Sequence, residues 1–305
     1  MPTPRPRPPR WCPGLLTWLA ALCGLAGVVL LTYTPAASWL AQYQQSQLIN
    51  SYNESMRRQP GTDSRPSDDE ALARARAYNA RLKAGALVAA NSNLPRSAEE
   101  PEADEYYSLL MGPGEMMGRL RIPSIDVDLP VYHGTADETL LRGAGHLQGT
   151  SLPVGGASTH SLITAHRGLA EATMFTNLDQ VTIGDMFTLE VFGEVLAYQV
   201  IQTQVVAPDE QEALYPQPDR DLVTLVTCTP LGINTHRILV TAERIIPTPD
   251  EALDAAMRSS DLPRFPWWAV WAGLGIIAVV AFLWRSGYRD ARLRAAHLGG
   301  DNLKT

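Results

Sequence analysis

Three residues of this sequence have side chains that together could carry out acyl transfer: Cys228, His166 and Arg237. A thiol is a strong nucleophile only as the thiolate, and its ordinary pKa near 8.5 leaves little thiolate at neutral pH unless an imidazole or a cation stabilises it. An imidazole can donate a proton to a leaving amine, and a guanidinium can stabilise a developing oxyanion. The three residue types therefore fill three roles of a cysteine acyl transferase.

The positions of these residues in the sequence favour a shared site. His166 ends the run Leu-Ile-Thr-Ala-His and Cys228 ends Thr-Leu-Val-Thr-Cys, so each lies just beyond a predicted strand, and Arg237 opens the next strand nine residues after the cysteine. A lone cysteine at a strand end is, however, often a small buried hydrophobe. Residue chemistry alone leaves both interpretations open.

The positions of the cysteines and histidines give little support for a disulfide or a metal site. Cys12 and Cys23 lie at or within an apolar run near the N-terminus, so Cys228 has no thiol partner in the rest of the chain. Other histidines lack the paired close spacing of a zinc site. They are His133, His146, His160 and His236. The sequence predicts no metal and no cofactor.

Short β-type runs separated by Gly, Pro and Asp turns begin at Gly118 and predict a mainly β domain, either a small barrel or a sandwich. The predicted strands are residues 118–122, 127–132, 162–165, 186–192, 196–206, 222–227 and 237–244. These strands must position the three reactive residues.

The segments before and after this domain differ from it in composition. Residues 39–58 and 67–83 are rich in helix formers and predict a helical stalk. Residues 84–113 are acidic and interrupted by Asn and Pro, which predicts a long covering loop without regular elements. Residues 247–266 are acidic and Pro-rich, and we expect them to form an exposed tether.

Two long apolar runs, residues 15–31 and 267–284, are typical of membrane-spanning helices. Basic residues precede the first run and follow the second, so the positive-inside rule predicts that both termini are cytoplasmic and that the segment between them is outside the membrane. The Pro-Ala-Ala-Ser stretch at residues 35–38 also leaves open a cleavable signal peptide.

The formal net charge is −7, but the two terminal segments carry eight Lys or Arg and only two Asp, which leaves the part between them near −13. Binding of nucleic acid needs a basic face. The charge therefore argues against a nucleic-acid partner.

The stretch from Leu225 to Arg237, Leu-Val-Thr-Cys-Thr-Pro-Leu-Gly-Ile-Asn-Thr-His-Arg, resembles the active-site strand and following loop of sortases. Further similarity covers residues 118–134, 146–156, 164–169 and 174–179, within a total of about residues 78–244. The N-terminal helical extension and the second apolar run resemble class C sortases, the pilin-polymerising cysteine transpeptidases of Gram-positive surfaces. We expect an eight-stranded β-barrel flanked by two transmembrane helices.

The resemblance implies that Cys228 is the nucleophile, His166 the general acid and Arg237 the oxyanion-stabilising or substrate-positioning residue. It implies attack on the Thr–Gly bond of a Leu-Pro-X-Thr-Gly sorting signal and transfer of the acyl group to a lysine amine of a pilin subunit. Thr227 and Asn234 flank these residues and are candidates for substrate binding. No cofactor is implied.

Two positions depart from the class C pattern. The covering loop usually carries Asp-Pro-aromatic, whereas the corresponding lid residues here are Leu94, Pro95 and Arg96, so neither the carboxylate nor the aromatic ring of a closed lid is present. Leu231 stands where a tyrosine is common. We expect a lid without its usual lock and an altered fit for the substrate.

The resulting hypothesis is a plasma-membrane protein with an extracellular catalytic domain. Its expected segments are residues 1–10, a cytoplasmic basic segment; 11–34, an anchor or signal peptide; 35–116, the stalk and covering loop; 117–247, the barrel; 248–266, the linker; 267–284, the second span; and 285–305, a basic tail. Two alternatives stay open: a sortase that attaches surface proteins to peptidoglycan, and a tethered adaptor without enzymatic activity.

Overall fold

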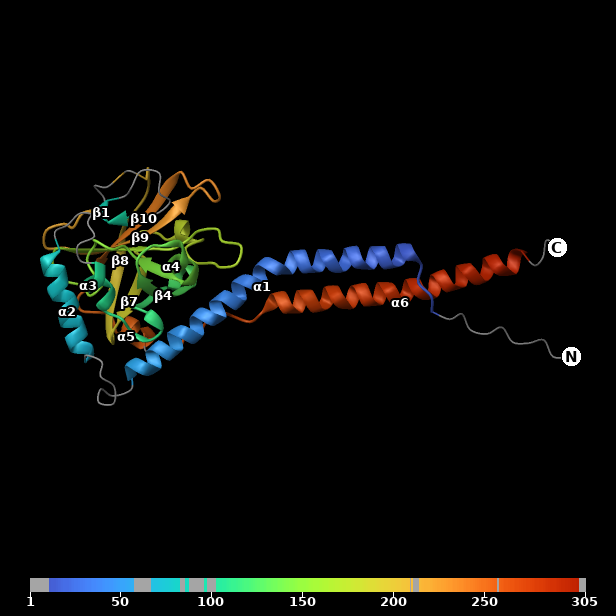
Figure 1. The fold of residues 1–305 in the computed structure, drawn as a ribbon, viewed down its shortest axis with the longest axis horizontal. Helices are drawn as coiled ribbons and strands as arrows, with labels where there is room; N and C mark the ends of the chain where they lie inside the picture. The colour runs from blue at the N-terminus through green and yellow to red at the C-terminus, as the bar shows by residue number, and fades with distance from the viewer. Residues whose placement is uncertain are drawn as a thin grey trace. The chain divides into compact units, whose positions relative to one another are not determined.

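The computed structural model describes residues 11–57, 67–82, 86–87, 96–97, 103–208, 210, 214–256 and 258–301, with 86–87, 96–97, 103–104 and 294–301 described by their backbone alone. The chain divides into two compact units (Figure 1). One unit contains residues Leu40–Arg264, and the other contains Met1–Trp39 together with Phe265–Thr305.

A closed eight-stranded barrel forms the centre of the larger unit, as expected. Its order is β10-β8-β7-β3-β4-β5-β6-β9, with parallel pairing between β4 and β5 and between β6 and β9 and antiparallel pairing elsewhere. The strands are β3 (Gly118–Ile122), β4 (Val127–His133), β5 (Ala144–His146), β6 (Thr159–Thr164), β7 (Met186–Val191), β8 (Glu194–Val206), β9 (Asp221–Thr229) and β10 (His236–Arg244). Alternate side chains of these strands form one hydrophobic core.

All seven predicted strands are present, but the sequence did not indicate β5. This strand contains only Ala-Gly-His. Three residues are too few to display a period of two, and alanine and glycine are not typical of strands. β5 is a strand because it pairs with β4 on one side and with β6 on the other. These two pairings close the barrel.

The second helix expected in the stalk is present, and it packs against the barrel domain. Helix α2 (Asp68–Arg81) begins after Ser67, whose Oγ accepts a hydrogen bond from Glu70 N at 3.2 Å. The helix buries Leu72, Ala75 and Tyr78 in a cluster that includes residues of the barrel wall. Because this apolar face needs cover, α2 packs on the barrel instead of standing apart from it.

The segment expected to be a covering loop contains a two-stranded sheet, β1 (Ala86–Leu87) with β2 (Arg96–Ser97), and a short helix, α3 (Ala103–Ser108). Arg96 pairs with Leu87 in this sheet. Leu94 and Pro95 lie outside the described residues. The expectation of a loop without elements was therefore wrong for α3, whose Tyr106 is fully buried.

The segment after the barrel also differs from the expected exposed tether. It contains α5 (Asp250–Ala256) and contacts β3 through a buried arginine. Arg119 donates two hydrogen bonds of 2.7 Å to Asp128 and lies 3.4 Å from Glu190. It also donates to the carbonyls of Ala256 and Arg258, at 3.5 and 3.2 Å. We call Arg119, Asp128 and Glu190 the Arg119 cluster.

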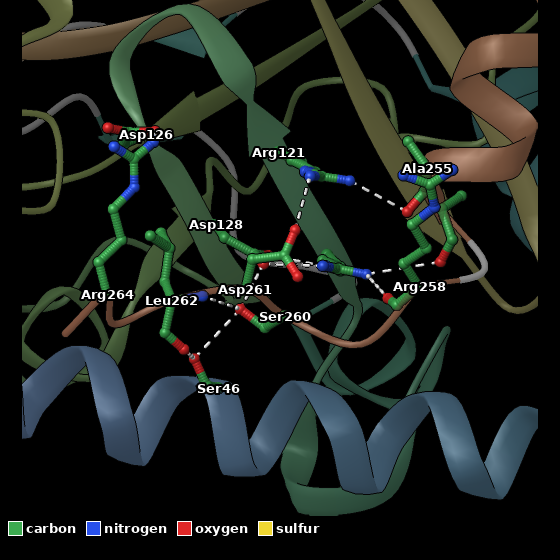
Figure 2. A network of polar contacts seen from close by, with 12 residues as sticks. Ser46, Arg121, Asp126, Asp128, Ala255, Arg258, Ser260, Asp261, Leu262 and Arg264 are labelled. Atoms are coloured by element: carbon green, nitrogen blue, oxygen red, sulfur yellow. Dashed lines mark hydrogen bonds and ion pairs between the residues drawn. The ribbon is translucent and has the colours of Figure 1, made fainter.

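Figure 2 shows how this segment is held near the cluster. Ser260 Oγ donates to Asp128 at 2.6 Å, Arg121 donates to the Ala255 carbonyl at 3.0 Å, and Arg264 forms a 2.7 Å ion pair with Asp126. The Ser46 hydroxyl of α1 binds both Ser260 and the Leu262 carbonyl. The acidic, Pro-rich composition predicted an exposed segment. The segment is instead bound to the barrel, because its carbonyl and carboxylate groups are partners of Arg119 and Arg121.

The smaller unit contains the apolar parts of α1 (Leu15–Arg57) and α6 (Trp267–Asp301), which lie side by side (Figure 1). Gly24 lies against Val279 and Gly275 against Val28, while Asp290 accepts hydrogen bonds from Gly14 N and Thr17 Oγ1, each 2.8 Å. Both helices contain 18-residue windows apolar enough to span a membrane, with mean hydropathies of 2.2 and 1.9, and almost none of either window is buried. This exposure is consistent with membrane anchoring. The first run and the helix expected at 39–58 form one continuous helix.

Candidate active site

Strand register brings His166, Cys228 and Arg237 to one row at the same end of the barrel. Cys228 of β9 lies directly opposite Arg237 of β10. In the parallel pair β6 and β9, Thr164 lies beside Val226, and this alignment continues because Ala165 N donates to the Val226 carbonyl at 3.3 Å. His166, two residues beyond Thr164, therefore lies just past the end of β6 and beside Cys228.

The row lies on the outer face of the barrel wall. Residues of β9 and β10 that point inward, such as Leu225 and Val240, belong to the barrel core. The alternate residues Val226 and Leu239 belong to a separate apolar cluster with Leu147, Leu162 and Leu214. Because side chains alternate along a strand, Cys228 and Arg237 share the outer face with that cluster. His166 and Cys228 are half-buried, so a ligand on this face can reach them.

The loop between β9 and β10 holds the arginine. Arg237 is 4% exposed, and its Nη1 donates to the carbonyls of Asn234 and His236, each at 2.9 Å. Asn234 adopts a positive φ of 59°, which asparagine tolerates better than most residues, and this conformation lets the loop curl back under the guanidinium. The ligands of Nη1 are neutral carbonyls, so they orient the guanidinium without cancelling its charge.

The two candidate substrate-binding residues occupy different environments. Thr227 is 1% exposed, and its Oγ1 donates to the Ala165 carbonyl at 2.8 Å, so it supports the strand end that carries His166. Asn234 is half-buried, and its Oδ1 has no hydrogen-bond partner among the described residues. This oxygen is itself buried, so neither it nor the Thr227 hydroxyl is open to a ligand in this conformation.

Burial shifts both titrating groups toward their neutral forms. Loss of hydration raises the pKa of the Cys228 thiol above its ordinary value, and the positive charge of Arg237 partly opposes this shift. Loss of hydration also lowers the pKa of His166, partly offset by the Asp137 carboxylate. In the free protein at neutral pH, thiol and neutral imidazole predominate, and the ion pair is a minor form.

Asp137 is a residue that sequence reasoning missed. It begins the short helix α4 (Asp137–Arg142) and is exposed, and its charge favours protonated His166. An acidic residue at a helix start is usually explained by the helix dipole, so nothing in the sequence connected it with a histidine 29 positions later.

Leu231 lies in the same β9–β10 loop and is 52% exposed. Its side chain reaches across Gly168, which has a φ of 77° and no room for a β-carbon beneath Leu231. The loop after Cys228 and the loop after His166 therefore touch at this point. Within the described part of the chain, no group of His, Cys, Asp and Glu is arranged to hold a metal ion.

Comparison with known proteins identifies the family to which the barrel belongs. Residues 120–245 match the model of the sortase domain. Sortase C-1 of Actinomyces oris is 46% identical, with a TM-score of 0.54, over 58% of this chain and 98% of that one. Sortase C of Streptococcus pneumoniae is 39% identical, with a TM-score of 0.57, over 67% of this chain and 98% of that one.

A curated relative, sortase A of Streptococcus agalactiae, is 29% identical over 131 residues, which are 42% of this chain. The chain spans about half of that relative's length, 52%.

The closed barrel and the matches to it define a sortase, the class of cysteine transpeptidases. The chain belongs to the sortase family, and its structural neighbours include class C sortases. The similarity to sortase C of S. pneumoniae covers more of the chain than the sortase domain does, so it extends beyond the barrel.

Proposed function

We propose that the chain is a membrane-anchored class C transpeptidase that cleaves a Leu-Pro-X-Thr-Gly sorting signal and joins its acyl part to a lysine amine of a pilin subunit. The observation that carries this proposal is the row of His166, Cys228 and Arg237 at adjoining strand ends. Nucleophile, proton donor and cation meet there on the outer face of the barrel.

In the first half-reaction, the Cys228 thiolate attacks the threonine carbonyl carbon and a C–S bond forms. Arg237 stabilises the oxyanion, because a fixed charge in a partly dehydrated site needs no reorganisation as the negative charge develops. The C–N bond to glycine then breaks, and the His166 imidazolium protonates the departing amine. The product is a thioester on Cys228.

In the second half-reaction, a lysine amine attacks the thioester carbonyl. Neutral His166 accepts the amine proton, the C–S bond breaks, and Cys228 leaves as the thiolate. The thioester keeps the acyl group reactive, so no nucleotide is consumed. The outcome is an isopeptide bond, and repetition on further subunits gives a covalent polymer.

Substrate and partner follow from the relatives and from the site. Sortase C of S. pneumoniae acts on pilin substrates, which supports a pilin partner for this chain. We propose that Asn234, whose carbonyl binds the Arg237 guanidinium, lies next to the bound signal in the β9–β10 loop. We propose that Thr227 contributes by supporting the His166 strand end.

The two apolar helices support an anchored location at the plasma membrane. With basic residues before the first and after the second helix, we propose that both termini are cytoplasmic and that the barrel is extracellular, where surface proteins are substrates. Labelling of cysteines introduced near each terminus and in the barrel, in intact cells with a membrane-impermeant maleimide, tests this orientation. Labelling of either terminus would contradict it.

The decisive test uses the full chain in proteoliposomes with a sorting-signal peptide and two amines, a pilin lysine peptide and a peptidoglycan cross-bridge peptide. We expect a thioester adduct on Cys228, seen by mass spectrometry, and an isopeptide product with the pilin amine. Cys228→Ala should abolish both products. A product with the wall amine alone would instead identify a wall-anchoring sortase, and unchanged activity of Cys228→Ala would refute the mechanism.

The protonation states predict a broad bell-shaped profile of kcat/KM against pH. The active form needs thiolate and imidazolium together, and its fraction falls below the pKa of His166 and above the pKa of Cys228. Burial lowers the first and raises the second, so the acid limb should lie below pH 6.5 and the alkaline limb above the ordinary range of a thiol. An acid limb above pH 6.5 would contradict this assignment.

A further inference from the structure

Arg167 follows His166 directly and uses each of its three guanidinium nitrogens for a different partner. Nη1 donates to Thr229 Oγ1 at 2.8 Å, Nε donates to the Thr176 carbonyl at 3.1 Å, and Nη2 forms a 2.8 Å ion pair with Asp179. The side chain is only 8% exposed, whereas Asp179 is 49% exposed. A solvating surface charge would not need a nearly buried side chain with three directed contacts, so solubility does not explain Arg167.

These partners belong to the two segments that carry the nucleophile and the histidine. Thr229 is the last residue of β9 and adjoins Cys228. Thr176 and Asp179 lie in the connection that follows His166, and this connection also returns a hydrogen bond of 3.0 Å from Phe175 N to the His166 carbonyl. Arg167 thus joins the end of the nucleophile strand to the loop that carries the histidine.

His166 depends on such a connection because it lies beyond the last ladder residue of β6, Thr164. Past that point, Ala165 N donates a hydrogen bond to the Val226 carbonyl of β9, and the Thr227 hydroxyl donates to the Ala165 carbonyl. A strand end held in this way can twist or shift, and a misplacement of about 1 Å at a reacting group can cost roughly 100-fold in rate.

We propose that Arg167 is a positioning residue of the transpeptidation reaction, which holds His166 at its working distance from Cys228 by linking Thr229 to the loop of residues 173–179. The inference rests on the proposed function. Arginine suits this role because its planar fork reaches three partners in fixed directions, whereas lysine offers a single point charge. Arg167 acts through its partners and not on the substrate.

The first test measures steady-state kinetics of the full chain in proteoliposomes with the sorting-signal peptide. Arg167→Gln should lower kcat on the order of 100-fold while KM stays near the wild-type value, because the acyl steps are impaired and the binding face is not. Arg167→Lys should recover only part of kcat. Rates are expressed per reactive Cys228, titrated by alkylation, so that loss of folded protein does not count as loss of catalysis.

Arg220 provides a matched control. Its three guanidinium nitrogens are likewise engaged, with Glu243 at 3.0 and 2.7 Å and with Gln217 at 2.5 Å, but it precedes the first residue of β9, at the end of the strand opposite to Cys228. Arg220→Gln should leave kcat and KM unchanged. A fall in kcat equal to that of Arg167→Gln would show that loss of any multiply bonded arginine has this effect, and would overturn the proposal.

A second readout needs no sorting signal. The rate of alkylation of Cys228 by iodoacetamide, measured against pH, should change at the titration of His166 in the wild type and lose this feature in His166→Ala. Arg167→Gln should resemble His166→Ala, because the displaced imidazole no longer influences the thiol, and Arg220→Gln should resemble the wild type. A wild-type profile for Arg167→Gln would refute the positioning role.

The pathway is tested with Thr229→Val, which removes the hydroxyl contact of Nη1 and keeps the side-chain volume. If Arg167 acts partly through Thr229, the double variant with Arg167→Gln should be no slower than Arg167→Gln alone. Additive losses would refute this link. Failure of the wild type to process any sorting-signal peptide, with the alkylation profiles as expected, would reject the proposed function and leave the positioning role of Arg167 standing.

Discussion

Arg119 and Arg237 are both buried arginines on barrel strands, but their surroundings differ. Arg119 is 0% exposed, with two bonds to Asp128 and Glu190 nearby, so carboxylates neutralise its charge. Arg237 is 4% exposed, donates to two neutral carbonyls and lies opposite a thiol whose pKa its charge lowers. One arginine is bound to permanent anions, and the charge of the other favours an anion at the neighbouring thiol.

This comparison separates stability from catalysis. A neutralised buried charge contributes to the fold and becomes costly only when one partner is lost. A charge oriented by neutral dipoles gains most when negative charge develops beside it. Substitutions of the two arginines should therefore have opposite consequences.

The largest effect is expected from Arg119→Gln. Removing this charge leaves the buried Asp128 carboxylate without its cationic partner, and loss of one member of a buried ion pair costs about 3–5 kcal/mol in the free energy of unfolding. The thermal midpoint of the purified full chain should fall sharply, while the remaining folded protein keeps its kcat. Arg264→Gln is the control: its 74% exposed ion pair with Asp126 should contribute at most about 1 kcal/mol.

Arg237→Gln should show the opposite behaviour. Removal of one oxyanion donor typically lowers kcat by about 10²–10³-fold, and we expect that loss with a small change in the thermal midpoint. Stopped-flow measurement of thioester formation on the full chain checks it. If Arg237→Gln destabilised the protein as strongly as Arg119→Gln but kept the rate of acylation, the distinction between the two arginines would be lost.

Glu190 of the Arg119 cluster should make the stability of the protein depend on pH. Burial raises the pKa of Glu190 to about 7, because Arg119 is closer to Asp128 and only partly offsets the lost hydration. The folded state then binds a proton that the unfolded state has released, so the contribution of Glu190 to the free energy of unfolding should fall as the pH rises from about 4.5 to 7. Buried histidines with lowered pKa values contribute in the opposite direction, so urea titrations compare the wild type with Glu190→Gln, and the wild type should lose stability relative to the variant across this range.

The smallest effect is expected from Asp137→Asn. The exposed carboxylate raises the pKa of His166 against the larger effect of burial, so its loss should move the acid limb of the kcat/KM profile to lower pH. Salt screens an exposed charge, so the difference from the wild type should disappear in about 1 M salt. A shift to higher pH would show that Asp137 acts on His166 in another way. Glu138→Asn, a neighbouring exposed acid, serves as the control.

Local sequence patterns were sufficient for much of the fold. Alternation of apolar residues predicted seven barrel strands, and Ser67 with Asp and Glu in the following turn predicted the start of α2. They failed where long-range pairing decides the structure. β5 is too short to have a pattern, and α5 with residues 258–264 packs because Arg119 and Arg121 need carbonyl partners that the linker supplies.

For the candidate site, the sequence by itself determined the chemical inventory: a single thiol outside the apolar helices, a histidine and an arginine at predicted strand ends, within a motif that resembles sortases. It could not determine the register that aligns residues 62 positions apart on β6 and β9, because a one-residue slip would turn Cys228 to the opposite face. Nor could it assign Asp137 or Arg167, whose partners are distant in sequence. Residue types set which reactions are possible; barrel closure decided which side chains meet.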